Sequence, residues 1–442
     1  MVRSLASLHE EFTAKNPKSR AQWERGKATM PGGIIKGAYW RAPFPFYVDK
    51  AEGCYLTDID GNTFVDFANH HSAMIVGHSH PDVVAAVQRE VERGFGLGNP
   101  TELEAEISQE IVSRFPSIEK VRFTNSGTES SLHATRLIRA KTGKPKIAKF
   151  EGAYHGSHDA LEHSVATPLD KAGPADSPAV MPGHKGMSRG SQDEVVMLPY
   201  NDRESVELIL REHQDEVAGV FFDGKPGMME IPDDFAHFLR DITKELGMYL
   251  VVDEVVGYRA GRAGYQGKAG IDPDLTIFGK IVGGGMPVGA MGGKSELMDM
   301  LDNTGAPSGI SQSGTFSGNN FTLAAGLATL RALTDEVYDH LESLAVRTQS
   351  GMKRVFNDAG IPNQVLAAGS VVNPFFTDKP VRDYRSFTNH DDELLGRISL
   401  GTHLKGYSLG STPMTIMLSS PMTNEHIDGL VNALEEVIAE ED

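Results

Sequence analysis

The chain has 442 residues, 40% of them hydrophobic and 23% charged, which is typical of folded proteins with a sizeable core. Its 42 Lys and Arg against 60 Asp and Glu give a formal net charge of -18, a field that argues against nucleic acid as a partner. The single cysteine excludes an internal disulfide and a cysteine-based zinc cluster, and no apolar run approaches the roughly 20 residues of a membrane span.

The N-terminal sequence is polar and shows no apolar signal segment, so we expect a cytoplasmic protein without membrane contact. Residues 1–30 are predicted to be helical, up to the breaker Met30-Pro31-Gly32-Gly33. Asp60-Gly61 between alternating apolar residues predicts a hairpin.

A regular alternation of strands and helices follows from about residue 100. The predicted helices are 101–115, 129–142, 203–216, 232–246, two within 321–359, and 424–440; the predicted strands are 121–124, 146–150, 195–198, 218–222, 248–252 and 275–278. This order predicts an α/β domain with a mainly parallel sheet over residues 71–330. Residues 1–70 and 331–442 are expected to form a smaller α+β domain from both chain ends.

Two of the predicted strands are each followed by a charged residue. Asp253 follows the strand 248–252, and Lys280 follows the strand 275–278 after one glycine. Ligands in open α/β sheets bind beyond the carboxyl ends of the strands. A lysine amine can form a Schiff base and shuttle a proton, and a carboxylate favours the protonated form of a cofactor ring nitrogen. A buried ion pair is the alternative, and the two residues alone do not decide between them.

The segment Ser126-Gly127-Thr128-Glu129 lies between a predicted strand and a predicted helix. Small hydroxyl residues and a glycine at a helix N-terminus can gather backbone N–H groups around a phosphate. An ordinary helix cap is an equal alternative, because serine and threonine are preferred there in any case. The segment 313–320 has the same character, and a cap is the stronger reading for it.

Tyr154 follows the strand 146–150 and could stack on a planar cofactor ring, although packing on the domain surface is the better reading for one isolated tyrosine. The nearby His155 and His158 are expected to be structural. No carboxylate or cysteine pattern accompanies them, so we expect no metal site.

Taken together, five motifs carry a family resemblance. They are TNSGTES, FEGAYHG, VVDEV, FGKIVGGGMPVGA and SGTFSGN, in this order. The sequence resembles class III pyridoxal-phosphate (PLP) aminotransferases, in the branch near glutamate-1-semialdehyde aminomutase and the β-amino-acid aminotransferases. The resemblance covers most of residues 30–330 and implies the fold type I architecture, with a mainly parallel seven-stranded sheet flanked by helices.

The resemblance also implies a role for each matching residue. Lys280 would carry the Schiff base, Asp253 would pair with the pyridine nitrogen, and Thr315 would reach the phosphate of a neighbouring subunit in a homodimer. The remaining cofactor contacts would be the phosphate-binding residues Ser126, Gly127 and Thr128, with Tyr154 on one ring face and Val255 on the other.

The activity implied is transfer of an amino group, by a ping-pong mechanism, from an amine or a β- or ω-amino compound to a 2-oxo acid. An intramolecular aminomutase of the glutamate-1-semialdehyde type is the alternative. Relatives usually carry a carboxylate-binding arginine near the position where this chain has Lys36. Some relatives have a further arginine near the C-terminus, and residues 410–414 of this chain contain none. We expect the substrate contacts to come from Lys36, Trp40, Arg41 and Arg259.

Overall fold

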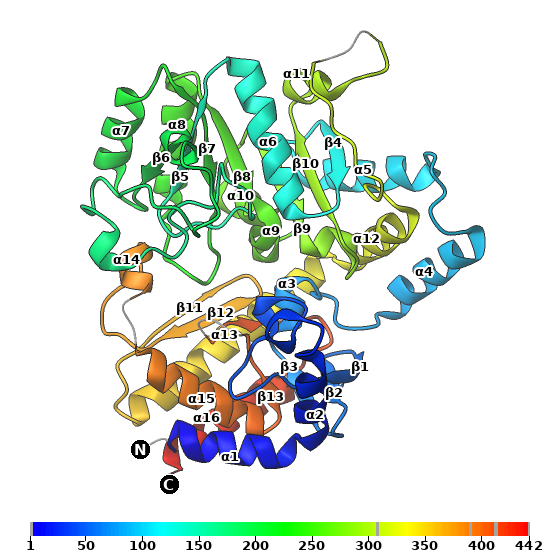
Figure 1. Ribbon diagram of the computed structural model, residues 1–442, viewed down its shortest axis with the longest axis vertical. Coiled ribbons are helices and arrows are strands. Elements are labelled where there is room, and N and C mark those ends of the chain that lie inside the picture. Colours follow the sequence, from blue (N-terminus) through cyan, green and yellow to red (C-terminus); the bar gives the residue numbers. More distant parts are fainter. Residues whose placement is uncertain (1–2, 306–308, 389–390, 411–413, 441–442) are drawn as a thin grey trace. The chain divides into compact units, whose positions relative to one another are not determined.

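The computed structural model describes residues 3–305, 309–388, 391–410 and 414–440 (Figure 1). The chain divides into two compact units. The small unit comprises Met1–Pro81, Glu336–Pro380 and Asn389–Asp442, and the large unit comprises Asp82–Asp335 and Val381–Thr388. The expected domain limits after residues 70 and 330 remain predictions. Among the described residues, no helix is both long and apolar enough to cross a bilayer.

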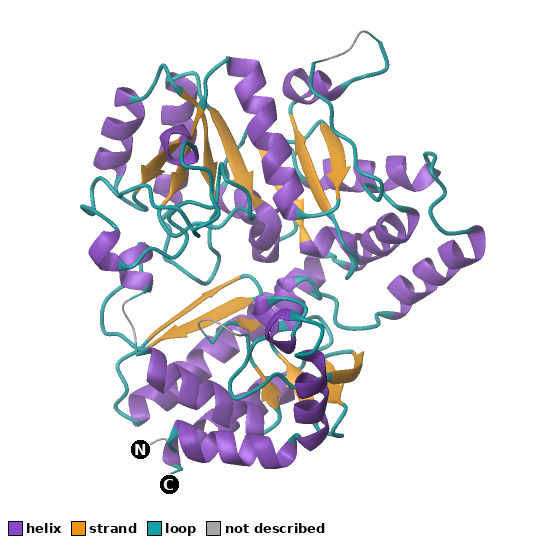
Figure 2. Ribbon diagram, in the orientation of Figure 1, coloured by secondary structure: helices purple, strands orange, loops and turns teal. Residues whose placement is uncertain are grey.

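A seven-stranded sheet forms the centre of the large unit (Figure 2). In sheet order its strands are β4 (Lys120–Thr124), β10 (Gly289–Gly293), β9 (Leu275–Gly279), β8 (Tyr249–Asp253), β7 (Val217–Phe222), β5 (Lys146–Phe150) and β6 (Val195–Leu198). All pairings from β9 to β6 are parallel, and β10 is antiparallel to both of its neighbours. The predicted fold class, with its mainly parallel seven-stranded sheet, is confirmed.

Strand β10 was not predicted, because its sequence Gly-Ala-Met-Gly-Gly has low strand propensity. Its glycines are required by close packing instead. A methyl group added at Gly292 would lie 2.8 Å from Cγ2 of Ile118, and one at Gly289 would collide with the carbonyl oxygen of Ser126. The strand therefore brings the start of helix α6 (Gly127–Thr142) close to the sheet.

Helices cover both faces of this sheet. The helices of the large unit, besides α6, are α4 (Pro81–Arg93), α5 (Glu102–Arg114), α7 (Arg203–Glu212), α8 (Asp233–Glu245), α9 (Glu254–Gly257), α10 (Gly264–Ala269), α11 (Ser295–Met298), α12 (Asn320–Ala332) and α14 (Tyr384–Phe387). On β8 the side chains alternate between two buried clusters. Leu250 and Val252 pack with residues of α8, whereas Val251 packs with residues of α6.

The small unit contains two sheets and the two chain ends. One sheet has the order β1 (Val48–Glu52), β2 (Tyr55–Asp58), β3 (Thr63–Asp66) and β13 (Tyr407–Ser408), and the other is β11 (Gln364–Ala368), β12 (Val371–Phe375) and β14 (Ile416–Met417). Its helices are α1 (Leu5–Lys15), α2 (Pro17–Gly26), α3 (Asn69–Ser72), α13 (Asp335–Asp358), α15 (Asp392–Leu404) and α16 (Asn424–Ala439). Nη1 of Arg3 lies 3.9 Å from Oε2 of Glu440, so the described ends meet in this unit.

Candidate active site

The N-terminus of α6 offers unpaired backbone donors at the edge of the sheet. Ser126 is the N-cap residue, and its Oγ accepts a hydrogen bond from the N–H of Glu129 at 3.1 Å. The first N–H groups of a helix have no partner inside it, and the helix dipole adds positive potential there. Gly127 and Thr128 occupy these first positions, so this end of the helix suits an anion.

Three chain segments approach closely at this point. A methyl group added at Gly127 would lie 3.1 Å from Cγ2 of Val255, in helix α9. One added at Gly279, the last residue of β9, would lie 3.5 Å from the backbone N of Gly127. Glycine at both positions therefore lets the helix start, the strand end and Val255 form one small cradle.

Asp253 lies at the end of β8 and is 5% exposed. Its Oδ1 accepts from the N–H of Val255 at 2.9 Å, and its Oδ2 lies 2.7 Å from Nδ1 of His155. Because the carboxylate only accepts, the Nδ1–H of His155 is the donor in this bond. Both oxygens are thereby fixed in direction, which gives the carboxylate one defined orientation at the strand end.

His155 contacts the predicted catalytic pair, and sequence reasoning missed this contact. We expected a structural histidine, and its buried ring is hydrogen-bonded to the carboxylate of the predicted catalytic pair. The sequence feature that could have pointed to His155 is its position in the FEGAYHG motif, directly after the predicted stacking residue Tyr154. The partner, Asp253, is 98 residues away in the chain, so the contact could not be read from spacing.

Lys280 begins the short 3-10 turn η6 (Lys280–Gly283) after the end of β9. Its φ of 52° lies in the left-handed region, which residues with a Cβ rarely adopt. Such backbone strain persists only where the surroundings hold it, and it is concentrated at functional sites. Strands β8 and β9 are parallel neighbours with Asp253 opposite Ile277, so Asp253 and Lys280 lie at the same edge of the sheet.

Tyr154 is 52% exposed as a residue, and its hydroxyl lies 3.0 Å from Oγ of Ser157. The same loop approaches α6 at Thr128, whose Oγ1 accepts from the N–H of Ser157 at 3.3 Å. Gly156, with φ of 104°, permits this approach, because a methyl group there would lie 2.7 Å from the Cα of Thr128. An aromatic face is thus available in the loop that contacts the start of α6.

Thr315 lies exposed in the turn that precedes α12. This turn is anchored to the site through Ser317, whose Oγ accepts from Nδ2 of Asn125 at 3.2 Å. Asn125 directly precedes the N-cap residue of α6. The predicted contact of Thr315 with a second subunit is compatible with its exposure and stays a prediction.

The predicted substrate residues fall in two groups. Arg259 belongs to the large unit and is fully buried, at 0% exposure. Lys36, Trp40 and Arg41 belong to the small unit, where Lys36 and Trp40 line an open pocket of about 540 Å³. Arg41 donates from Nη2 to the carbonyl oxygen of Leu409 at 2.9 Å, and burial lowers its pKa to about 10. Of residues 410–414, positions 411–413 lie outside the described residues.

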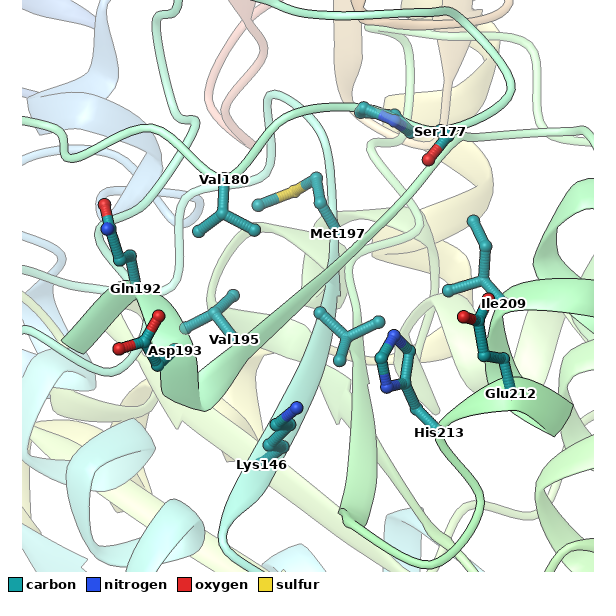
Figure 3. A pocket seen from close by; sticks show the side chains of 12 residues that line it. Lys146, Ser177, Val180, Gln192, Asp193, Val195, Met197, Ile209, Glu212 and His213 are labelled. Carbon is teal, nitrogen blue, oxygen red and sulfur yellow. The ribbon is translucent and has the colours of Figure 1, made fainter. Parts of the chain in front are cut away.

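A second pocket, of about 310 Å³, lies beside the edge strand β6 (Figure 3). Lys146, Asp193, Glu212 and His213 line it together with apolar residues of β6, and none of the predicted site residues does so. Within the described ranges, no group of three or more His, Cys, Asp or Glu residues has the arrangement of a metal site.

Comparison with known proteins decides the family. A family model described as aminotransferase class-III matches residues 37–438. The chain belongs to the class-III aminotransferases. The glutamate-1-semialdehyde 2,1-aminomutase of Rhodopirellula baltica is 37% identical over 446 residues, which cover 99% of both proteins.

Solved transaminase structures share the fold. An ω-transaminase from Sphaerobacter thermophilus is 36% identical, with a TM-score of 0.92, and the match covers 95% of this chain and 97% of that one. A transaminase solved with PLP bound is 30% identical, with a TM-score of 0.88 and coverage of 96% and 97%. The predicted family and the predicted cofactor are therefore confirmed: this is a PLP-dependent enzyme of the class-III aminotransferases.

The described residues fit this cofactor. A phosphate requires backbone donors and positive potential, which the start of α6 provides. A planar ring requires flat or apolar surfaces, and Tyr154 and Val255 supply them. A basic ring nitrogen requires a carboxylate of fixed direction, which Asp253 offers.

Proposed function

We propose that Ser126, Gly127 and Thr128 bind the phosphate of PLP, and that Tyr154 and Val255 contact its two ring faces. The support for this proposal is that helix start, loop and carboxylate meet at one edge of the large unit's sheet. When bound, PLP withdraws electrons from the carbon that carries the amino group. The protein then has to orient the substrate, hold charge and move protons.

Asp253 and Lys280 would perform the two central tasks. The carboxylate of Asp253 would keep a proton on the ring nitrogen, and the hydrogen bond from His155 would hold that carboxylate in place. The Nζ of Lys280 would bind the cofactor aldehyde in the resting enzyme. Once released by a substrate amine, it would carry a proton between the cofactor and the substrate carbon that bears the amino group.

We propose that the reaction is an intramolecular amino-group transfer of the glutamate-1-semialdehyde aminomutase type. The observation that carries this proposal is the 37% identity to the Rhodopirellula baltica enzyme over 99% of both chains. The resemblance noted in the sequence implied intermolecular transfer first, with the aminomutase as the alternative, and the similarity to named aminomutases supports that alternative better. The cofactor-binding residues serve either reaction, because both require the same carboxylate, lysine and phosphate site.

An intermolecular aminotransferase remains the second candidate, supported by the ω-transaminase at 36% identity and a TM-score of 0.92. In that reaction a separate amine or β- or ω-amino compound would be the donor, and a 2-oxo acid would be the acceptor. Lys36, Trp40, Arg41 and Arg259 remain proposed substrate contacts for either reaction. The complete burial of Arg259 gives it the least support of the four.

The two reactions differ in their need for an acceptor. The test supplies glutamate 1-semialdehyde to the purified, cofactor-loaded enzyme, first without any 2-oxo acid and then with pyruvate. The aminomutase proposal expects many turnovers per site without pyruvate and no stimulation by it. Turnover that stops after a single round and resumes on addition of pyruvate would overturn it in favour of the aminotransferase.

We further propose that the enzyme is a cytoplasmic homodimer in which Thr315 reaches the partner subunit's phosphate site. The support is a group of exposed apolar side chains near Thr315 in the large unit. Phe316 is 67% exposed and Phe95 is 74% exposed, and the ring of Phe95 lies 4.9 Å from that of Phe321. Exposed aromatic surface of this kind is typical of protein interfaces.

A further inference from the structure

A buried lysine lies in the middle of strand β5. Lys149 is 0% exposed, and its neighbours Ala148 and Phe150 belong to the hydrophobic core. An ammonium group in such surroundings costs free energy unless its donors are paired. Burial, with a smaller contribution from the charge of Lys225, lowers the pKa of Lys149 to about 7, and Glu162 opposes this shift.

All three donors of Lys149 are directed at the loop that follows β5. Its Nζ lies 2.7 Å from the carbonyl oxygen of Ala153, 2.9 Å from that of Leu161 and 2.6 Å from that of His163. These three bonds use the full donor capacity of an ammonium group. They join the start of the loop to the point where it returns, ten residues later, and thereby close it into a fixed shape.

This loop carries two residues of the candidate active site. Ala153 directly precedes Tyr154 and His155, so the bond to its carbonyl oxygen fixes the backbone from which both side chains extend. Lys225 adds a weaker contact one residue earlier, at 3.3 Å from the carbonyl oxygen of Gly152. The ring of Tyr154 is half exposed, so its position depends on its backbone more than on packing.

We propose that Lys149 is a positioning residue that holds Tyr154 and His155 in place for the cofactor. The proposal rests on the proposed role of Tyr154 as a ring contact. Replacing the lysine by an apolar residue would remove the cost of the buried charge but would leave three buried carbonyl groups without their donor. The loop would then be free to shift, and the tyrosine ring and the histidine that orients Asp253 would shift with it.

The test compares Lys149→Met with a matched control in the same strand, Lys146→Met. Lys146 pairs with Glu216 at the protein surface, 2.9 Å away, and lines the pocket beside β6 (Figure 3). Two quantities are measured: the dissociation constant of PLP, by fluorescence titration, and amide hydrogen exchange of residues 151–164 in the cofactor-free protein. We expect Lys149→Met to weaken PLP binding at least about tenfold and to speed exchange in this loop, while Lys146→Met changes neither.

A double-mutant cycle separates positioning from a general loss of structure. In a Tyr154→Ala background, Lys149→Met should weaken PLP binding much less than it does in the wild type, because its effect acts partly through the tyrosine. Equal weakening in both backgrounds, or wild-type affinity together with wild-type exchange in Lys149→Met, would overturn the proposal.

A second variant, Lys149→Gln, keeps the proposal testable if Lys149→Met does not fold. Lys149→Gln keeps two N–H donors, and we expect intermediate affinity and intermediate loop exchange. If neither variant folds while Lys146→Met does, the lysine serves the fold as a whole and the positioning role is wrong. If Tyr154→Ala leaves PLP affinity unchanged, the ring contact itself fails, whereas the exchange measurement still reports whether Lys149 holds the loop.

Discussion

At the scale of single residues, Glu254 is the most unusual group beside the site. It is fully buried next to Asp253, and its carboxylate accepts from the N–H of Tyr265 at 2.9 Å and from that of Gln266 at 2.8 Å. A methyl group at Gly264 would lie within 2.6 Å of its carboxylate oxygens, so the space is shaped around this group. Burial nevertheless raises its pKa to about 7, because the hydrogen bonds only partly offset the loss of water.

This raised pKa predicts a pH dependence of stability. The folded protein binds the proton of Glu254 more tightly than the unfolded chain, whose ordinary value is 4.5. The resulting stabilisation is complete below about pH 4.5 and is lost as the pH rises through about 7. Between pH 5 and 8, the free energy of unfolding of the cofactor-free protein should therefore fall more steeply in the wild type than in Glu254→Gln, by on the order of 2 kcal/mol. Urea unfolding at several pH values measures this, and parallel curves for both proteins would contradict it.

The two residues of the predicted catalytic pair stand out in the sequence, but the hydrogen bonds that hold Asp253 in the structure do not. Asp253 and Lys280 each follow a short apolar run, and the position of such residues at strand ends is a local property. The bond between His155 and Asp253 joins the loop after β5 to the end of β8, and the donors of Lys149 reach that same loop, whose path the sequence does not define. The one feature of the sequence that could have drawn attention to Lys149 is its charge among the apolar residues of a predicted strand.

At the scale of elements, the start of α6 is the feature that the account depends on most. Gly127→Ala adds a methyl group 3.1 Å from Cγ2 of Val255, so it should push Val255 away from the ring and raise the dissociation constant of PLP about tenfold. Alanine favours helix over glycine, so lost helix stability would not explain such a result. Gly190→Ala is the control, because φ at Gly190 is -85° and no atom lies within 4 Å of the added methyl group. Equal affinities for all three proteins would refute the proposed cradle.

The predicted elements agree with the structure where the hydrophobic pattern is strong. Strands such as Val195–Leu198 and Val217–Phe222 are buried on both faces and appear in the sequence as continuous apolar runs. Strand β10 and helix α4 were not predicted. Strand β10 is rich in glycine because close packing leaves no room for side chains there. Helix α4 has a narrow apolar face, with Val83 and Ala86 as its buried apolar residues.

At the scale of the whole molecule, the proposed role of Thr315 predicts complementation between subunits. Thr315→Arg and Lys280→Ala should each inactivate the enzyme when present alone. In a mixed dimer, the site with an intact Lys280 would receive an intact Thr315 from its partner. We therefore expect up to half of the wild-type activity per mixed dimer, measured after the two variants are unfolded together and refolded. Activity that stays at the level of the parents would show that Thr315 acts within its own subunit or not at all.

Both proposed reactions require Lys280 to hold PLP covalently at the edge where β8 and β9 end. The most direct measurement is reduction of the cofactor-loaded enzyme with borohydride, followed by proteolysis and mass spectrometry. We predict a single modified peptide, with the reduced cofactor on Nζ of Lys280, and no modified peptide and no turnover in Lys280→Ala. An adduct on another lysine, or full turnover in Lys280→Ala, would contradict the account.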